Sequence, residues 1–296
     1  MTVWAEALTG LAAAGGLALG WASLVERRWF ACRHHEVPAL RGPGTLRILH
    51  VSDLHLLPWQ RDKLAFVERL AAQRPDLVVA TGDLLGHPGA IEPCVAALRS
   101  LRGDTPGIFV LGSNDFFAPG PRNPLAYFRG PSRLKGGQRR LETDRLVAGL
   151  VEAGWQLVDN QRVTIPTARG AVDVAGLGDP HIRRDRPDAL AGPPAGSAAL
   201  RLGVVHAPYR RALDALTAAG SELILAGHTH GGQVRIPGVG ALVTNCDLPT
   251  RQARGLSRHG AAWLHVSAGL GTSMYAPVRF CCRPEASLLT VSQRTG

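Results

Sequence analysis

The chain of 296 residues has few lysines and few aromatic residues. Lysine occurs only as Lys63 and Lys135, so the formal net charge of +10 is carried almost entirely by arginine. A basic surface suits phosphorylated substrates, nucleic acid or anionic lipid. Phe, Trp and Tyr make up only 5% of the residues, whereas proteins that bind single-stranded nucleic acid stack its bases on aromatic rings. The composition therefore argues against a nuclease and leaves a phosphorylated substrate open.

The chain also lacks a Cys-x-x-Cys pair, and its cysteines are odd in number. They are Cys32, Cys94, Cys246, Cys281 and Cys282. This pattern argues against a disulfide framework and against a zinc ribbon. We therefore expect thiols in a reducing compartment, most of them buried and inert.

The N-terminus lacks the basic segment that opens a secretory signal. Residues 7–24 are apolar, with Glu6 before them and Glu26-Arg27-Arg28 after them. This run is near the lower limit of length for a helix that spans a bilayer. Two interpretations stay open for residues 1–28: a membrane anchor, or a helix that is packed on the main domain or loosely attached to it. We expect a cytoplasmic protein, held at the inner face of the membrane if the helix inserts, because arginines follow it.

The first part of the main domain alternates between two patterns. Dense apolar runs of four to six residues are typical of buried strands, and apolar residues at helical spacing separate them. The strands are predicted at 46–51, 77–80 and 108–111, and the helices at 63–73 and 91–101. This order predicts parallel strands joined by helical crossovers.

The second half is richer in predicted strands. They fall at 163–165, 172–176, 202–205, 223–226, 234–236, 263–266 and 288–291, with helices at 146–153 and 207–218. Residues 29–45, which hold two prolines and two glycines near their end, are predicted to be a linker before a domain at 46–296. Residues 119–143 are rich in Gly, Pro and Arg and are predicted to be a basic insertion, since loops of that length are usually functional or disordered.

Short polar clusters follow several of the apolar runs. They are Asp53-Leu54-His55, Gly82-Asp83, Gly112-Ser113-Asn114-Asp115, His206 and Gly227-His228-Thr229-His230. Open α/β sheets place their sites at the carboxyl ends of strands. On an extended segment residues i and i+2 point the same way, so Asp53 and His55 are expected to reach one metal. A lone Asp-x-His is more often a turn or a cap, but Gly-His-Thr-His-Gly-Gly is hard to explain by core packing.

The donor atoms of these clusters are nitrogen and oxygen, with no thiolate. Such a set favours Mn, Fe or Zn over a soft metal. Two of these ions about 3.5–4 Å apart would lower the pKa of a bridging water and clamp a phosphoryl group. The combined pattern therefore predicts a two-metal hydrolytic site.

The clusters resemble the motifs of the calcineurin-like metallophosphoesterase superfamily, which run D-x-H, G-D, G-N-H-[DE], H and G-H-x-H. They occur here in that order between about residues 46 and 232. The segment around Val278-Arg279-Phe280 is similar to the bacterial branch related to membrane-associated phosphodiesterases. The resemblance implies an α/β fold, a four-layer α/β/β/α sandwich of two mixed sheets with helices outside. It also implies a phosphoester substrate and two divalent metal ions.

The resemblance further implies how the ligands divide between the ions. One metal would take Asp53, His55, Asp83 and His230, and the second would take Asp83, Asn114, His206 and His228, with Asp83 bridging. Hydroxide held by the metals would attack phosphorus in line.

The third motif departs from the family pattern. Without a gap, Ser113 falls at the ligand position, whereas we favour Asn114 because an amide oxygen suits a hard cation better than a hydroxyl does. The family's histidine is absent in either alignment, and a general acid is typically worth about 10²–10⁴ in rate. Asp115 and His181 are candidate replacements, with a helix cap and an exposed turn residue as their respective alternatives.

Basic residues of the insertion are candidate substrate ligands, because arginine pairs well with phosphate. They include Arg122, Arg139 and Arg140, and the alternative is a mobile, solvated loop. The sequence thus predicts a metal-dependent phosphoester hydrolase, most simply a phosphodiesterase. The alternatives are a binding module that has lost its chemistry on the same fold, and a nuclease.

Overall fold

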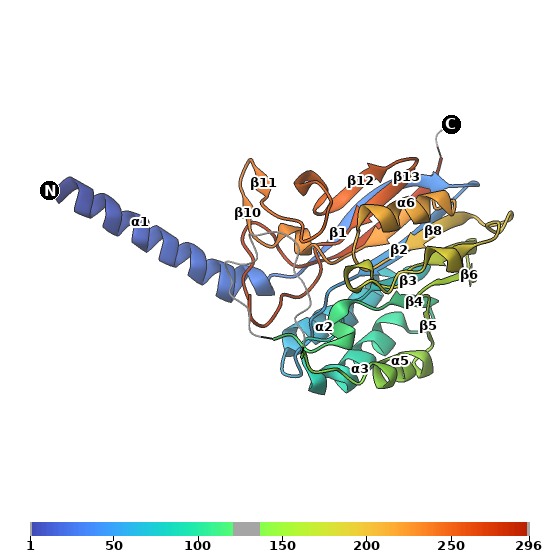
Figure 1. Ribbon diagram of the computed structural model, residues 1–296, viewed down its shortest axis with the longest axis horizontal. Coiled ribbons are helices and arrows are strands. Elements are labelled where there is room, and N and C mark those ends of the chain that lie inside the picture. Colours follow the sequence, from blue (N-terminus) through green and yellow to red (C-terminus); the bar gives the residue numbers. More distant parts are fainter. Residues whose placement is uncertain (1, 121–136, 295–296) are drawn as a thin grey trace.

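The computed structural model describes residues 2–120 and 137–294. Two six-stranded mixed sheets pack face to face (Figure 1). The first has the order β1 (Ala31–Leu40), β14 (Glu285–Gln293), β2 (Thr45–Val51), β3 (Leu77–Thr81), β4 (Gly107–Val110), β5 (Trp155–Leu157). The second has the order β12 (Gly255–His259), β13 (Ala262–Val266), β9 (Leu223–Ala226), β8 (Leu200–Val204), β7 (Gly170–Gly176), β6 (Gln161–Thr167).

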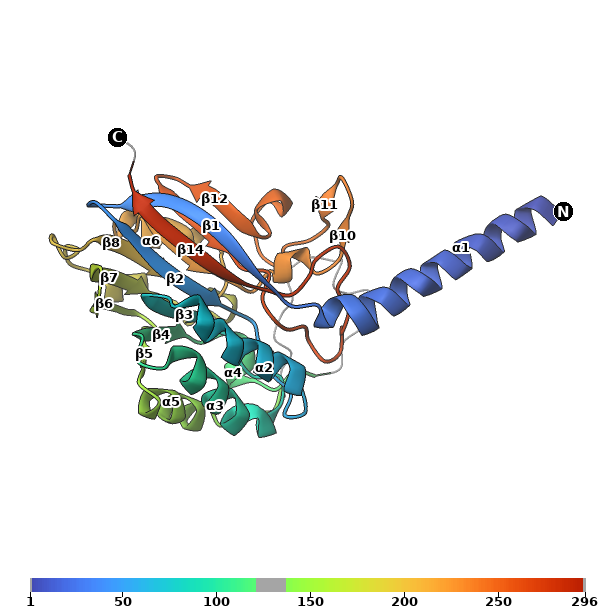
Figure 2. The same cartoon turned by 180° about the vertical axis from the view of Figure 1, so that it is seen from behind.

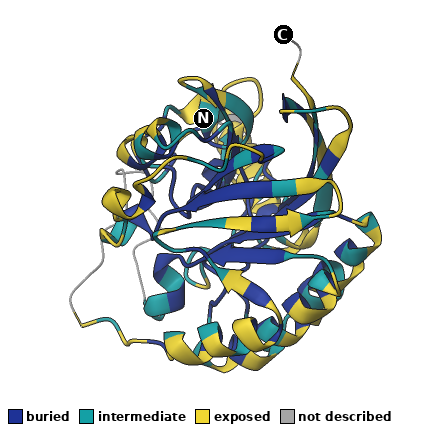
Figure 3. Cartoon of the chain, turned by 90° about the vertical axis from the view of Figure 1, so that its right-hand side faces the viewer, coloured by how far each residue is buried: buried dark blue, intermediate teal, exposed yellow. Residues whose placement is uncertain are grey.

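Helices cover the outer faces of both sheets. The first sheet packs on α2 (Arg61–Arg69), α3 (Ile91–Arg102) and α5 (Thr143–Glu152), and the second on α6 (Arg210–Ala218). The helices expose one face and bury the other, while the strands between them are largely buried (Figure 3). The four-layer α/β/β/α sandwich expected from the sequence is confirmed.

The alternation of side chains along β2 shows how one strand serves two cores. Leu46 and Ile48 enter the core between the sheets, whereas Leu49 and Val51 enter the core under α2 and α3. Successive residues of a strand point to opposite faces, so a strand buried on both sides is mostly apolar. The same rule explains why the central strands were predictable as dense apolar runs.

The N-terminal helix α1 (Thr2–Gly20) projects away from the domain (Figures 1 and 2). A π-helical turn, η1 (Trp21–Val25), and a 3-10 turn, η2 (Glu26–Arg28), join it to β1. The segment Trp4–Arg28 is long and apolar enough to cross a membrane, judged by length and composition. The alternative of a helix packed along the domain is not what the structure shows, because α1 is exposed over most of its length.

The predicted linker at 29–45 is wrong over most of its length. Residues 31–40 form β1, which pairs in parallel with β14. A proline is tolerated there because β1 is an edge strand, and its register shifts between Pro38 and Leu40. The first sheet therefore begins at Ala31 rather than at residue 46.

Other predicted elements occur with small shifts. The four predicted helices correspond to α2 with the 3-10 turn η3 (Leu70–Gln73), α3, α5 and α6. The strand predicted at 234–236 is only β10 (Arg235–Ile236), which forms a hairpin with β11 (Gly240–Ala241). Most of the predicted insertion, including Arg122, lies outside the described residues.

The place of β1 in the core gives a stability test. Leu40→Ala should lower the free energy of unfolding by about 2–5 kcal/mol, because the buried side chain leaves a cavity between the sheets. The matched control is Val151→Ala, on the exposed side of α5, which should change stability by no more than about 0.5 kcal/mol. Urea denaturation followed by circular dichroism measures both, and equal values would mean that β1 does not pack as described.

Candidate metal centre

Polar side chains from both sheets meet at one edge of the sandwich, where parallel strands end. Asp53 and His55 follow β2, Asp83 follows β3, His206 follows β8, and His228 and His230 follow β9. Asn114 lies on the one-turn helix α4 (Ser113–Phe116) that follows β4. The structure therefore brings all seven predicted metal ligands to the same end of the molecule.

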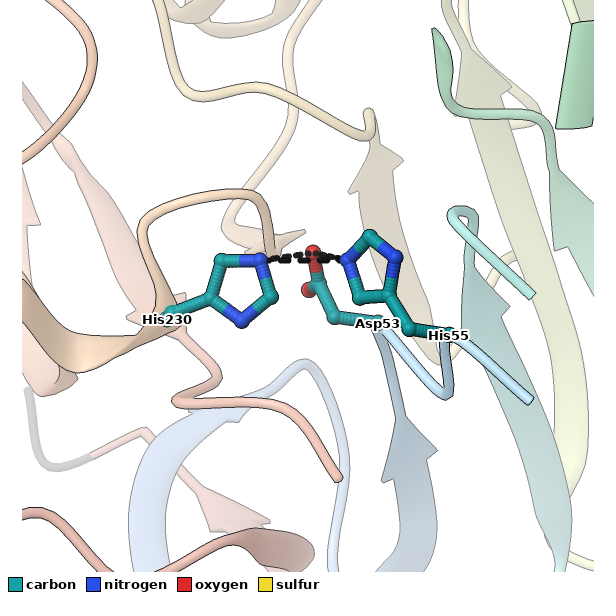
Figure 4. A group of neighbouring side chains, drawn as sticks. All are labelled: Asp53, His55 and His230. Atoms are coloured by element: carbon teal, nitrogen blue, oxygen red, sulfur yellow. Dashed lines mark hydrogen bonds and ion pairs between the residues drawn. The ribbon is translucent and has the colours of Figure 1, made fainter. Parts of the chain in front are cut away.

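One group consists of Asp53, His55 and His230, whose ligand atoms lie within 4.8 Å of one another (Figure 4). The Nε2 atoms of the two imidazoles are 3.2 Å apart, and Nε2 of His230 is 3.5 Å from Oδ1 of Asp53. His230 donates its Nδ1–H to the carbonyl oxygen of Gly271, which turns the Nε2 lone pair toward the carboxylate.

A second group consists of Asp53, Asp83 and His206, again within 4.8 Å. His206 donates its Nδ1–H to the carbonyl oxygen of Thr81 at 2.6 Å, so Nε2 faces the carboxylates. That Nε2 is 3.6 Å from Oδ2 of Asp83 and has no hydrogen-bond partner within the described part of the chain. Asp83 also lies 3.5 Å from Nε2 of His55, which places its carboxylate between the two groups.

The centre carries unbalanced negative charge. Burial, with the neighbouring Asp83 adding to it, raises the pKa of Asp53 to about 6. Burial alone would lower the pKa of His206, but Asp83, Asp179 and Asp53 raise it well above its usual value. The environment thus favours positive charge at Nε2 of His206, which faces two carboxylates, so these residues fit a divalent cation in place of that proton.

The remaining imidazoles are held neutral. Burial lowers the pKa of His55 to about 4 and lowers the pKa values of His228 and His230 well below the usual range. A neutral imidazole is the form that binds a metal ion.

The expectation that Asp53 and His55 converge along an extended segment is wrong in its geometry. Both have positive φ, at 48° and 40°, and Asp83, His228 and His230 do as well, at 52°, 68° and 51°. Non-glycine residues seldom adopt this left-handed region, and strained backbone of this kind gathers at functional sites. The side chains meet because the chain turns sharply at each strand end, which spacing alone does not reveal.

Glycine is required beside these turns. A Cβ on Gly227 would collide with Ser52 and Asp53, and one on Gly112 would collide with Asp83. The two glycines allow the backbone to approach the carboxylates closely.

His228 diverges from His230, as a sharp turn predicts. Its ring lies 5.2 Å from that of His206 and 4.6 Å from that of His181, measured between centroids. Its Nε2 is 3.2 Å from the carbonyl oxygen of Asn245, and its backbone N–H donates to Asp53. His228 therefore borders the centre without joining either close group.

The third motif reaches the centre through Asn114. Its backbone N–H and its side-chain amide donate to the two oxygens of Asp83, at 2.8 and 2.7 Å. Of the two residues left open by the alignment, Asn114 is thus the one whose side chain contacts the carboxylate between the groups. A flip of the amide would present its oxygen instead, since the two ends have similar shape.

The two candidate acids differ in their surroundings. The carboxylate of Asp115 accepts backbone N–H groups from Leu84, Leu85 and Gly112, which is the arrangement of a cap. His181 instead lies against His228, and its Nδ1 is 3.0 Å from the Tyr209 hydroxyl. The contacts therefore favour His181 as the candidate closer to reacting groups.

The arginines of the insertion that the structure describes are exposed. Arg140 forms a β-bridge with Phe117, and the carbonyl oxygen of Arg139 accepts from the N–H of Ala118. Both residues thus sit directly beside the third motif, at the rim of the centre.

Comparisons with known proteins show the family of the chain. A model of the family described as calcineurin-like phosphoesterase matches residues 46–232, which is more than half of the chain. The chain belongs to the calcineurin-like phosphoesterase family. It is 26% identical over 280 residues to Phosphodiesterase YaeI of Escherichia coli (strain K12). This alignment covers 91% of each chain. It is 25% identical over 297 residues to the Uncharacterized metallophosphoesterase YkuE of Bacillus subtilis (strain 168), covering 97% of this chain and 93% of that protein.

Among solved structures, the chain is also matched to phosphopantetheinyl hydrolase (PptH) from Mycobacterium tuberculosis. The two chains are 13% identical with a TM-score of 0.43, and the match covers 82% of this chain and 96% of the other.

A buried hydrogen-bond chain, which the sequence did not predict, supports the candidate metal centre. Ser52 donates to Oδ2 of Asp53 at 2.5 Å, and Thr81 donates to Ser52 at 2.7 Å. Because the Thr81 proton is used, Nε2–H of His50 must donate to Thr81, at 2.8 Å. His50 is neutral, since burial lowers its pKa to about 3, so its Nδ1 accepts from Nδ1–H of His265 at 3.0 Å. The chain therefore has one polarity, directed toward Asp53.

A buried arginine supports the opposite side of the centre. The guanidinium of Arg279 is fully buried and donates to the carbonyl oxygens of His230, Ala268 and Gly271, at 3.0, 2.7 and 2.6 Å. It thus ties the loop after β13 to the backbone of a candidate ligand. A polar residue in an apolar run, as at His50 and Ser52, was a signal available in the sequence, whereas nothing local marks Arg279 as buried.

The hydrogen-bond chain predicts a loss of metal affinity on a conservative change. Ser52→Ala should weaken Mn²⁺ binding by about 10–100-fold, because partners of ligands orient them. The matched control is Ser100→Ala, on the exposed side of α3, which should bind as the parent chain does. Calorimetric titration of the metal-free chain measures both affinities, and an unchanged affinity for Ser52→Ala would show that the chain does not position Asp53.

Proposed function

We propose that this member of the family is a metal-dependent phosphodiesterase that uses two divalent ions, Mn, Fe or Zn. The observation that carries the proposal is the buried Nε2 of His206, which faces Asp53 and Asp83 without a hydrogen-bond partner in the part of the chain that the structure describes. The name of the YaeI relative supports a diester substrate rather than a monoester.

In this proposal the residues divide between the ions as the family's motifs imply, with His228 turning from the border of the centre to the second ion. Asp53, His55 and His230 hold one ion, Asp83 bridges, and Asn114, His206 and His228 hold the other. When bound, the ions would activate a water and neutralise charge on the phosphoryl group. The backbone turns and the hydrogen bonds of Ser52 and Thr81 fix the carboxylates before substrate arrives, so little reorganisation is needed during the reaction.

Proton transfer to the leaving group falls to His181 in this proposal. The Tyr209 hydroxyl lies 3.0 Å from Nδ1 of His181, and the His181 ring lies tilted against that of His228, with centroids 4.6 Å apart. Asp115 is instead a positioning residue, because its oxygens hold the turns after β3 and β4. The chain lacks the histidine of the family's third motif, so we expect it to prefer diesters with good leaving groups. The same absence makes a binding module on this fold the second candidate function.

We further propose that α1 anchors the domain to the inner face of a membrane. The helix exposes large apolar side chains along its length, among them Trp4, Leu8 and Leu17. Trp4 and Trp21 near its two ends match the positions that tryptophan prefers at the two membrane interfaces. Arg27 and Arg28 after the helix favour a cytoplasmic domain.

The catalytic proposal is tested by removing one imidazole. His228→Ala should lower the rate of Mn²⁺-dependent hydrolysis of bis(p-nitrophenyl) phosphate by more than about 100-fold. Loss of a residue that only hydrogen-bonds to a metal ligand typically costs about 10–100-fold, and loss of a ligand should cost more. The control is His34→Ala, an exposed histidine on β1, which should retain the parent rate. If the parent chain binds Mn²⁺ but shows no metal-dependent turnover, the binding module replaces the enzyme.

The rim arginines give a separate test of substrate binding. Replacing Arg139 and Arg140 together with Ala should raise KM by about 10-fold, or about 1.4 kcal/mol, with little change in kcat. The control is the double variant Arg69→Ala and Arg99→Ala. It removes the same positive charge from exposed positions on α2 and α3. Steady-state kinetics compare the two double variants, and equal KM values would remove these arginines from the substrate site.

A further inference from the structure

Large apolar side chains are exposed around the point where α1 leaves the domain. We call this set the apolar collar: Trp21, Leu24, Val25, Trp29, Ile236, Val239 and Leu242, whose exposed fractions run from 40% to 73%. Exposed apolar residues are normally scattered singly over a soluble surface, and a contiguous group marks an interaction site.

The two halves of the collar are joined by one backbone segment. The N–H of Arg279 donates to the carbonyl oxygen of Ala22 in η1, at 3.0 Å. One residue later, the carbonyl oxygen of Phe280 accepts from the N–H of Arg235 in β10, at 2.9 Å. Both views show the β10–β11 hairpin on the side of the domain from which α1 projects (Figures 1 and 2).

The chemistry of the collar suits the interface of a bilayer. The rings of Trp21 and Trp29 meet edge to face with centroids 6.1 Å apart, and the guanidinium of Arg283 lies 3.9 Å above Trp29. Tryptophan prefers the headgroup level, where arginine can pair with lipid phosphate. Arg28 is also exposed there, so the collar offers positive charge as well as apolar surface.

The neighbouring helix decides which partner covers the collar. The apolar helix α1 ends directly beside the collar. A bilayer or protein that surrounds α1 must therefore also contact Trp21 and Leu24. A protein partner at the collar alone would leave α1 uncovered, whereas a bilayer covers both.

We propose that the apolar collar docks the catalytic domain onto the surface of the bilayer, with the β10–β11 hairpin dipping into the headgroup region. This proposal rests on the membrane anchoring by α1 proposed above. It adds that the domain does not swing freely on its anchor, because the collar fixes its orientation. The metal centre is then held near the membrane, since β10 begins five residues after His230.

Tryptophan fluorescence in brominated lipid tests the docking. The full chain carrying Val239→Trp is reconstituted in nanodiscs of phosphatidylcholine and phosphatidylglycerol, with or without bromine on the acyl carbons nearest the headgroup. The emission added by this tryptophan should fall by roughly half or more in brominated lipid, because docked residues lie about 5–10 Å into the headgroup and acyl boundary. Val151→Trp is the matched control, an exposed valine on α5, and its added emission should not change.

Two further measurements separate the possible failures. Leu242→Trp, at the other side of the hairpin, repeats the test in case Val239→Trp disturbs the turn. If the chain resists carbonate extraction from vesicles but neither hairpin tryptophan is quenched, docking is overturned and anchoring stands. If carbonate extracts the chain, both are overturned, while the metal-dependent activity is judged separately by the His228→Ala experiment.

Discussion

The structure depends on two carboxylates, Asp53 and Asp83, buried side by side where the strands of both sheets end. Burying an anion without partners costs several kcal/mol, so the surrounding chain must supply donors or positive charge. Backbone N–H groups of His228 and Asn114 and the hydroxyl of Ser52 donate to these oxygens. The left-handed turns at the strand ends bring those donors within reach. Strained backbone and buried charge are therefore parts of one arrangement, which a divalent cation completes.

The polar interior extends this arrangement into the space between the sheets. An apolar core would be simpler to pack, yet His50, Thr81 and His265 form a hydrogen-bonded chain through it that ends on Asp53. His50 donates through Nε2–H and accepts at Nδ1, and His265 donates through Nδ1–H, so the tautomers of both histidines are fixed. A chain with one polarity holds the carboxylate in a single orientation, which is what a preorganised metal site requires.

The sequence indicated which side chains gather at one edge of the sheets better than it placed the start of the domain, for physical reasons. Asp83 and His206 each follow a dense apolar run, and such a pattern indicates where a buried parallel strand ends. The β1 strand was missed because Pro38 and the glycines after it resemble a linker, and an edge strand tolerates them. The pairing of His50 with His265 joins residues 215 apart in the chain, and no local pattern carries that information. The left-handed turns were likewise hidden, since they arise from the sandwich closing around the carboxylates.

The N-terminal segment supports the candidate metal centre as well as carrying the proposed anchor. The buried carboxylate of Glu26 accepts the N–H groups of Cys281 and Cys282 at 3.0 and 2.5 Å, so it fixes the loop that carries Arg279. Arg279 in turn holds the carbonyl oxygen of His230. Hydrogen bonds and one short loop thus couple the base of the helix to the backbone of a candidate ligand. An anchor joined through a solvated linker would have no such effect, and the contacts of Glu26 are what distinguish the two arrangements.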